Sequence, residues 1–356
     1  MRDFSESPML VIWELTQACD LACRHCRASA QPDRNPAELS TADAYRVLEQ
    51  IREFGSPLVV LTGGDPLKRA DLFEIIDRSV SLGLRTTVTP SATPLLTREA
   101  VKRLKDAGLA RMAISLDGPN RAIHDGFRRV DGSFDRTMDA LQWAAEVGLE
   151  TQINTTVSRH NMEHLDDIAT IVGESLARLW SVFFLVVTGR ARLEDDLTAE
   201  EYERVFDFLY QTSLRAPFDI KTTEAPHYRR YHAQQRKRNP TEARTAAPSM
   251  IQRHGGVNDG RGLIFLSHTG EIFPSGFLEL SAGNIRSKTL ADAYRNSQLF
   301  QVIRDSDQLE GKCGACEYRN LCGGSRSRAQ ALTGNFMASD PRCVYQPKAM
   351  PDQICA

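Results

Sequence analysis

Short apolar runs rich in β-branched residues alternate with amphipathic stretches along residues 9–215. Such runs predict buried strands, whereas apolar positions that recur every three to four residues predict helices. The predicted strands are residues 9–15, 58–62, 84–89, 111–116, 149–157 and 180–187. The predicted helices are residues 40–54, 70–82, 97–107, 133–147, 162–177 and 198–214. A helix follows each strand, which predicts parallel strands covered by helices.

Local start and stop signals support these helices. Ser40 and Asp43 have the spacing of a capping box, in which each side chain bonds to the other's backbone N–H group. Thr97 and Ser133 suit N-cap positions. Glycines suited to a left-handed helix end follow four of the predicted helices: Gly55, Gly83, Gly108 and Gly148.

Six strand–helix units are too few to close an eight-stranded barrel. We therefore predict an α/β fold built on an open, partial (β/α)6 barrel of the TIM type over residues 1–215. The pattern by itself also fits a flat, doubly wound sheet. In both arrangements ligands bind at the carboxyl ends of the strands.

The rest of the chain divides into two further stretches. Residues 216–262 contain a polar, basic and glycine-rich segment, which predicts a linker or a lid over the substrate. Residues 263–356 are predicted to form a small second domain. It begins with a hairpin of residues 263–267 and 271–273 and has a short helix near residues 290–297.

Composition narrows the class of protein. The 356 residues carry a formal net charge of -2, which gives no general attraction to nucleic acid or to an anionic membrane. The longest apolar run, Leu179 to Val187, is too short to cross a bilayer. The polar N-terminus, Met1 to Glu6, has no signal-peptide core. We expect a cytoplasmic protein with neither a membrane nor a nucleic-acid partner.

The cysteines fall into two groups with none between residues 26 and 313, so cysteine is not used as core filler. The first group, Cys19, Cys23 and Cys26, has CxxxCxxC spacing and follows the first predicted strand. The second comprises Cys313, Cys316, Cys322 and Cys343, and Cys355 has no assigned role. Such groups of cysteines indicate bound metal. A zinc site is one alternative, and disulfides are another. Three thiolates can also hold three irons of a cubane cluster and leave the fourth iron open.

Two further motifs follow predicted strands at the same edge of the sheet. Residues 63–67 read Gly-Gly-Asp-Pro-Leu, where glycines permit close approach and Asp65 offers a carboxylate. Ser115 and Asp117, in the motif Ser-Leu-Asp-Gly, offer a hydroxyl and a carboxylate suited to a ribose. Each motif in isolation is also typical of an ordinary tight loop.

In this order, the three motifs resemble the radical S-adenosylmethionine (SAM) superfamily. The resemblance implies a catalytic 4Fe-4S cluster on Cys19, Cys23 and Cys26. It also implies that SAM binds the open iron and is reductively cleaved to a 5′-deoxyadenosyl radical. This radical then abstracts hydrogen from the substrate. An electron donor such as flavodoxin or ferredoxin is implied as a partner. The implied SAM contacts are Gly63, Gly64 and Asp65 at the amino group, Ser115 and Asp117 at the ribose, Arg128 and Asn154 at the carboxylate and ribose, and Val186 and Val187 at the adenine.

The second cysteine group resembles the auxiliary-cluster domain called SPASM when it holds two clusters and twitch when it holds one. Where two-cluster members place further cysteines, this chain has Ser275 and Ser325. The resemblance therefore implies one auxiliary 4Fe-4S cluster with four thiolate ligands. A zinc knuckle remains the alternative for this spacing.

Several segments narrow the resemblance to radical SAM enzymes of the alternative haem pathway and of nitrite-reductase haem biosynthesis. They include residues 26–30, 152–156, 188–190, 225–228 and 267–271. This resemblance implies hydrogen abstraction from a tetrapyrrole side chain, leading to oxidation or decarboxylation. His227, Tyr228, Arg229 and Arg230 are candidate substrate contacts, with a basic surface helix as the alternative. A peptide-modifying radical SAM enzyme and a non-enzymatic iron-sulfur carrier are the competing functions.

Overall fold

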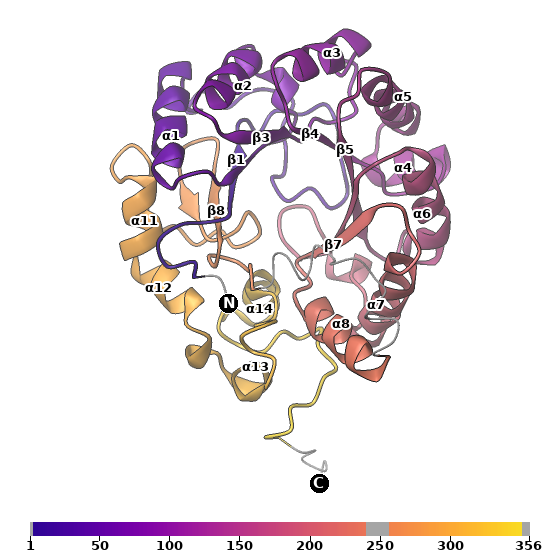
Figure 1. Ribbon diagram of the computed structural model, residues 1–356, viewed down its shortest axis with the longest axis vertical. Helices are drawn as coiled ribbons and strands as arrows, with labels where there is room; N and C mark the ends of the chain where they lie inside the picture. Colours follow the sequence, from indigo (N-terminus) through magenta and orange to yellow (C-terminus); the bar gives the residue numbers. More distant parts are fainter. Residues whose placement is uncertain (1–2, 240–255, 351–356) are drawn as a thin grey trace.

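A curled nine-stranded sheet forms the centre of the protein (Figure 1). The computed structural model describes residues 3–239 and 256–350. The strand order is β7-β6-β5-β4-β3-β2-β1-β8-β9; neighbours from β7 to β8 are parallel, and β9 is antiparallel to β8. The strands are β1 Leu10–Glu14, β2 Leu58–Thr62, β3 Arg85–Val88, β4 Arg111–Ser115, β5 Thr151–Val157, β6 Leu179–Phe184, β7 Asp219–Thr223, β8 Leu263–Leu266 and β9 Ile272–Phe273.

Helices cover the outer face of this sheet (Figure 1). Those of the first part of the chain are α1 Thr41–Glu53, α2 Leu72–Ser81, α3 Arg98–Asp106, α4 Arg121–Arg128, α5 Ser133–Glu146, α6 Leu165–Glu174, α7 Ala199–Ser213 and α8 His227–Arg238. The predicted capping box of Ser40 and Asp43 starts α1, and Thr198 with Glu201 forms another at α7. No helix of the described ranges combines the length and apolar character that crossing a membrane requires.

The two faces of the sheet differ in burial. Along β5, odd-numbered residues are buried and even-numbered residues are half-buried. On β6, Trp180 and Val182 are fully buried in the core beneath the helices. Their register partners on β5, Ile153 and Thr155, are also fully buried. The core therefore lies between sheet and helices, and half-exposed side chains line the inside of the curl.

The partial-barrel fold class and the six predicted strands are confirmed. Two strands extend the barrel beyond the six units: β7 joins β6, and β8 joins β1. Within the predicted linker 216–262, the structure instead forms β7 and α8. The sequence of β7, Asp-Ile-Lys-Thr-Thr, has one strongly apolar residue, because only one of its faces packs on the core. The central part of that predicted lid, residues 240–255, lies outside the described residues.

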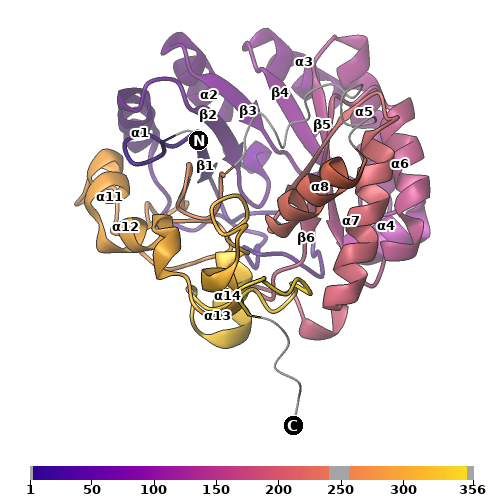
Figure 2. The same cartoon turned by 60° about the horizontal axis from the view of Figure 1, so that its bottom comes forward.

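The C-terminal part continues directly from the sheet. Its helices are α11 Leu290–Asn296, α12 Gln298–Arg304, α13 Gly311–Ala315 and α14 Arg326–Thr333. The predicted hairpin and the helix near residues 290–297 are confirmed as β8–β9 and α11. Figure 2 shows α11 and α12 beside α1, with α13 and α14 below the open side of the curl. The strand β8 belongs to the main sheet, although the sequence analysis assigns it to the second domain. The predicted domain boundary at residue 262 stays a prediction.

The loop after β2 packs tightly on the loop after β1. Gly64 donates its N–H group to the Thr16 carbonyl at 2.8 Å, and the Asp65 N–H group donates to the Ala18 carbonyl at 2.7 Å. A Cβ atom on Gly63 would lie 2.5 Å from the Thr16 carbonyl oxygen, and one on Gly64 would overlap the Ala18 carbonyl. Both glycines are thus required by close backbone approach.

This packing predicts the effect of adding one methyl group. Gly64→Ala forces the backbone of residues 16–18 to move and should destabilise the protein by about 1–3 kcal/mol, the usual cost of overpacking. Chemical denaturation of the anaerobically reconstituted protein measures the change. Gly126→Ala is the matched control, because its Cβ atom meets nothing within 4 Å and the site lies in α4. Equal stability of the Gly64 variant and the wild type would contradict the packing argument.

Candidate functional site

The first cysteine group occupies the loop that follows β1. Cys19, Cys23 and Cys26 are free thiols at the carboxyl end of the sheet. The Leu21 N–H group donates to the Cys19 sulfur at 3.4 Å, and the Ala30 N–H group donates to the Cys26 sulfur at 3.4 Å. Burial raises the pKa of the Cys19 thiol to about 11 and also raises the pKa of Cys23. Buried thiols ionise readily only when a cation stabilises their thiolate forms. The site therefore suits a cationic metal cluster.

A buried arginine supplies positive charge beside these sulfurs. The Arg128 Nη1 atom lies 3.5 Å from the Cys23 sulfur, and the guanidinium also forms an ion pair with Asp117. Burial disfavours the charged form, but the Asp117 carboxylate and the Cys23 sulfur outweigh it and raise the pKa of Arg128. Its buried Nε atom has no hydrogen-bond partner in the described residues. Arg128 is thus a fixed cation, and its Nε–H group remains available as a hydrogen-bond donor.

Asp117 and Asp65 are both fully buried, and protein groups satisfy both carboxylates. Asp117 accepts the Thr156 N–H group at 2.7 Å as well as Arg128. Asp65 accepts from the Leu67 N–H group at 3.2 Å, the Ser91 N–H group at 3.3 Å and the Thr93 hydroxyl at 2.7 Å. These contacts hold the loops at the ends of β2, β3, β4 and β5 in one arrangement.

Sequence reasoning missed Ser91, in the loop after β3. Its hydroxyl donates to the Gly64 carbonyl at 2.9 Å and lies 3.4 Å from the Cys19 sulfur. Ser91 therefore joins the glycine motif to the cysteine loop. The available signal was its place after a predicted parallel strand, where polar residues gather around ligands.

Arg190 was also missed as a site residue, although its segment was part of the resemblance. Its Nε atom donates to the Cys23 carbonyl at 3.0 Å, and its backbone N–H group donates to the Cys26 carbonyl at 3.0 Å. Gly189, at φ +59°, leaves no room for a Cβ atom against the Cys26 carbonyl. The loop after β6 thus clamps the cysteine loop from the side opposite β2.

The remaining predicted SAM contacts line the inside of the curl. Ser115 on β4 and Asn154 on β5 are half-buried register partners. The Gln152 amide donates to the Asn154 side-chain oxygen at 2.7 Å. Val186 is buried and Val187 is half-buried in the loop after β6. The structure therefore gathers all the predicted SAM contacts at one end of the sheet.

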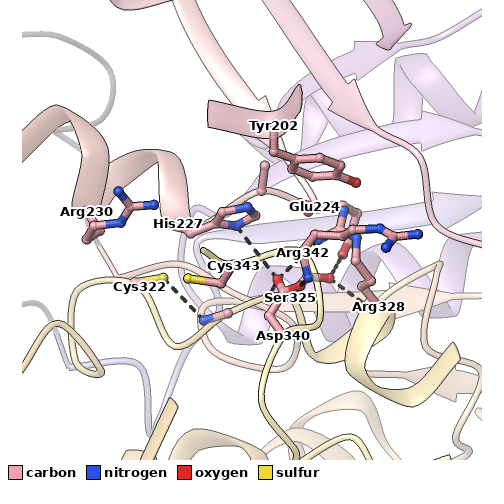
Figure 3. Close-up of polar contacts among 12 residues, drawn as sticks. Tyr202, Glu224, His227, Arg230, Cys322, Ser325, Arg328, Asp340, Arg342 and Cys343 are labelled. Atoms are coloured by element: carbon pink, nitrogen blue, oxygen red, sulfur yellow. Dashed lines mark hydrogen bonds and ion pairs between the residues drawn. The ribbon is translucent and has the colours of Figure 1, made fainter. Parts of the chain in front are cut away.

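The second cysteine group lines one hollow in the C-terminal part. Cys313, Cys316, Cys322 and Cys343 all line it, together with His227 and Arg230 of α8. Figure 3 shows Cys322 and Cys343 beside His227 and Arg230. Backbone N–H groups of Tyr318, Gly324 and Asp340 donate to the sulfurs of Cys316, Cys322 and Cys313 at 3.4, 3.3 and 3.4 Å. No three His, Cys, Asp or Glu side chains in the described ranges are placed to hold a single metal ion. Four sulfurs around a hollow with N–H donors fit a cluster.

The residues His227 to Arg230 do not form an exposed basic surface. His227 is fully buried and stacks on Tyr202 with ring centres 5.5 Å apart (Figure 3). Arg230 forms an ion pair with Glu203, and Arg229 donates to the carbonyls of Leu321 and Val257. The interpretation of this segment as a basic surface helix is therefore wrong, whereas the substrate contact stays a prediction. The start of α8 anchors the second cysteine group to the barrel.

Ser275 and Ser325 meet at a single carboxylate. Their hydroxyls donate to the two oxygens of Glu224, at 3.3 and 2.6 Å. Glu224 follows β7 with φ +59°, and Arg328 donates to its backbone carbonyl at 2.7 Å (Figure 3). Burial and the neighbouring Asp259 carboxylate raise the pKa of Glu224 to about 8. The two serines thus belong to a hydrogen-bonded junction between β7 and the C-terminal part. Cys355 lies outside the described residues.

Known proteins match both the sequence and the fold. The model of the radical SAM superfamily matches residues 13–172. An AdoMet-dependent heme synthase of Oleidesulfovibrio alaskensis is 40% identical over 353 residues, or 99% of this chain and 91% of that protein. The Fe-coproporphyrin III synthase of Methanosarcina barkeri is 27% identical, covering 94% of this chain and 87% of its own. A PqqA peptide cyclase of Bradyrhizobium diazoefficiens is 26% identical, covering 96% and 87%.

The fold has a solved counterpart. The crystal structure of Streptococcus suis SuiB superposes with a TM-score of 0.70 at 19% identity, covering 97% of this chain and 78% of that one. This likeness supports the curled barrel and its C-terminal extension. The full-length identity to the AdoMet-dependent heme synthase favours an enzyme over a non-enzymatic iron-sulfur carrier. The chain belongs to the radical SAM superfamily and is an enzyme that binds SAM and an iron-sulfur cluster.

Proposed function

We propose that this radical SAM enzyme abstracts hydrogen from a carboxylate-bearing side chain of a tetrapyrrole and thereby oxidises or decarboxylates it. The observation that carries the proposal is the 40% identity to an AdoMet-dependent heme synthase across 99% of the chain. The peptide cyclase is a more distant relative at 26% identity, so peptide modification is the second candidate.

We propose that Cys19, Cys23 and Cys26 hold a 4Fe-4S cluster with one open iron. When bound, this cluster supplies the electron that cleaves SAM. Arg128 supports the assignment, since a buried guanidinium with a free Nε donor lies beside Cys23 and can bind the SAM carboxylate. Gly63, Gly64 and Asp65 face the amino group, and Asp65 acts by fixing its loop because protein donors satisfy its carboxylate.

The nucleoside part of SAM is assigned to the next three strand ends. Ser115 and Asn154 are half-buried neighbours that offer polar groups to the ribose. Asp117 holds that region in place through Thr156 and Arg128. Val187 packs against the adenine from the loop after β6.

For the second cysteine group we propose one auxiliary 4Fe-4S cluster on Cys313, Cys316, Cys322 and Cys343. Four thiolates leave no open iron, so such a cluster carries electrons or holds shape rather than binding substrate. The hydroxyls of Ser275 and Ser325 are committed to Glu224, which argues against a further cluster there.

The function is tested by adding dithionite, SAM and iron coproporphyrin to the anaerobically reconstituted protein. We expect a shifted porphyrin absorption band, release of 5′-deoxyadenosine, and a product that has lost carbon dioxide and hydrogen, detected by mass spectrometry. Cys23→Ala should release no 5′-deoxyadenosine. SAM cleavage without any change in the porphyrin spectrum or mass would refute the tetrapyrrole and favour a peptide substrate.

The auxiliary assignment predicts a change in iron content. Cys316→Ala should retain the SAM-binding cluster and lower bound iron from about eight to about four per chain. Iron analysis with electron paramagnetic resonance of the reduced protein measures both quantities. An unchanged iron content in this variant would contradict a second cluster on these cysteines.

We further propose that an acidic electron carrier such as flavodoxin or ferredoxin docks beside the cysteine loop. A hollow of about 360 Å³ lies there, lined by four arginines and two carboxylates: Arg24, Arg129, Arg190, Arg192, Glu194 and Asp195. Arg190 bonds directly to the carbonyls of Cys23 and Ala30, so a carrier bound at this hollow would lie next to the cluster loop. The excess of positive charge suits an anionic partner.

Charge reversal tests this docking surface. Arg192→Glu should slow flavodoxin-driven SAM cleavage by about fivefold to tenfold at low ionic strength, because steering by surface charge is lost. The rate with dithionite should stay unchanged. Arg46→Glu on α1 is the control, since the two side chains are 68% and 70% exposed. Slowing with both reductants, or with neither, would refute the docking site.

A further inference from the structure

A row of polar residues crosses four strands on the inside of the curl. In the parallel register Ser115 on β4 pairs with Asn154 on β5, Asn154 pairs with Ser181 on β6, and Ser181 pairs with Lys221 on β7. Register partners on adjacent strands share one face of a sheet. Figure 1 shows β4, β5 and β7 curving around the same interior.

Residues adjacent to Lys221 establish which face the row occupies. The residues before Ser181 and Lys221 are Trp180 and Ile220, which pair with each other and are buried in the core beneath the helices. Because successive side chains on a strand point to opposite faces, Lys221 faces the interior of the barrel. Its side chain is half-buried there.

Lys221 has no counter-charge among the residues that the structure describes. No carboxylate of the described residues forms an ion pair with it, and the charge that acts on it is the cation Arg111, which is paired with Glu150. Burial and Arg111 together lower the pKa of Lys221 to about 8. Buried charges in folded proteins are normally paired, because an unpaired one loses hydration without compensation. An anionic group of a ligand would supply the missing partner.

The opposite wall of the interior contains an apolar row. Ile12 on β1 pairs with Phe265 on β8 and with Val60 on β2, which places these three side chains in one row. Val11 and Val59, next to them in the sequence, are fully buried in the outer core, so this row also faces inward. The interior thus offers an apolar row of Ile12 and Val60 opposite the polar row that ends at Lys221. Further along the same wall, Arg27 lies over the Phe265 ring at 4.7 Å and pairs with Glu14.

We propose that Lys221 binds a carboxylate of the substrate inside the barrel, with Ile12 and Val60 against an apolar ring system. The inference rests on the proposed function and deepens it. A tetrapyrrole combines a flat apolar macrocycle with carboxylate side chains, which matches the apolar row of Ile12 and Val60 and the cation of Lys221. Lys221 is then a specificity-determining residue that selects the carboxylate and sets the register of the ring.

The experiment uses the reconstituted full chain and absorbance titration with iron coproporphyrin and with its methyl ester, whose side chains are uncharged. Lys221→Met should weaken binding of iron coproporphyrin at least tenfold, the order expected for a lost charge-assisted hydrogen bond. The ester should bind wild type and Lys221→Met alike, and Lys221→Arg should keep most of the affinity for the acid. Lys102→Met, on the exposed face of α3, should bind as the wild type does.

Thermal melting distinguishes a ligand contact from a structural role. Without ligand, Lys221→Met should melt no lower than the wild type, because the change removes an unpaired charge from a half-buried place. Unchanged affinity for iron coproporphyrin, equal losses for acid and ester, or a lowered melting temperature would overturn the assignment. A wild type that cleaves SAM yet binds neither porphyrin would instead overturn the proposed tetrapyrrole function, and this failure is visible without any variant.

Discussion

The parallel register of β1 to β8 is the constraint on which the rest of the structure depends. Parallel strands end at one edge, so each loop that leaves a strand there meets the loops of its neighbours. The loop after β1 carries Cys19, Cys23 and Cys26 into this edge. The loop after β2 reaches it so closely that only glycine fits at residues 63 and 64. The loop after β6 closes on it from the other side through Gly189 and Arg190.

Electrostatics then make this edge suitable for a metal cluster and a charged nucleotide. Burial opposes ionisation of the Cys19 and Cys23 thiols, while Arg128 and backbone N–H groups favour it. The second cysteine group uses the same means, with Arg230 near Cys322 and Cys343 and N–H donors at three sulfurs. In both places the protein supplies positive charge without exposing the sulfurs fully.

The two parts of the protein are joined through β7 and α8. Glu224, at the end of β7, accepts from Ser275 and Ser325, and Arg328 donates to its backbone carbonyl. Asp340, two residues before Arg342, accepts from Arg328 and lies beside His227. This polar junction joins the C-terminal part to the end of β7. Pairing with β6 places β7, and with it the interior residue Lys221, in the barrel wall.

Several features of this protein follow from the sequence by itself. Alternation of apolar runs and amphipathic stretches determined six strands and their helices, since each element's periodicity is local. Cysteine spacing and the glycine motif determined the superfamily, because those residues act through short-range geometry. The hydrogen-bond partners of Asp65, the roles of Ser91 and Arg190, and the burial of His227 came only from tertiary structure, because their partners are remote in the chain. The same reason applies to β7: its polar sequence becomes a strand only when β6 supplies the edge. Only the curl of the sheet turns Lys221 inward, where none of the described carboxylates pairs with it.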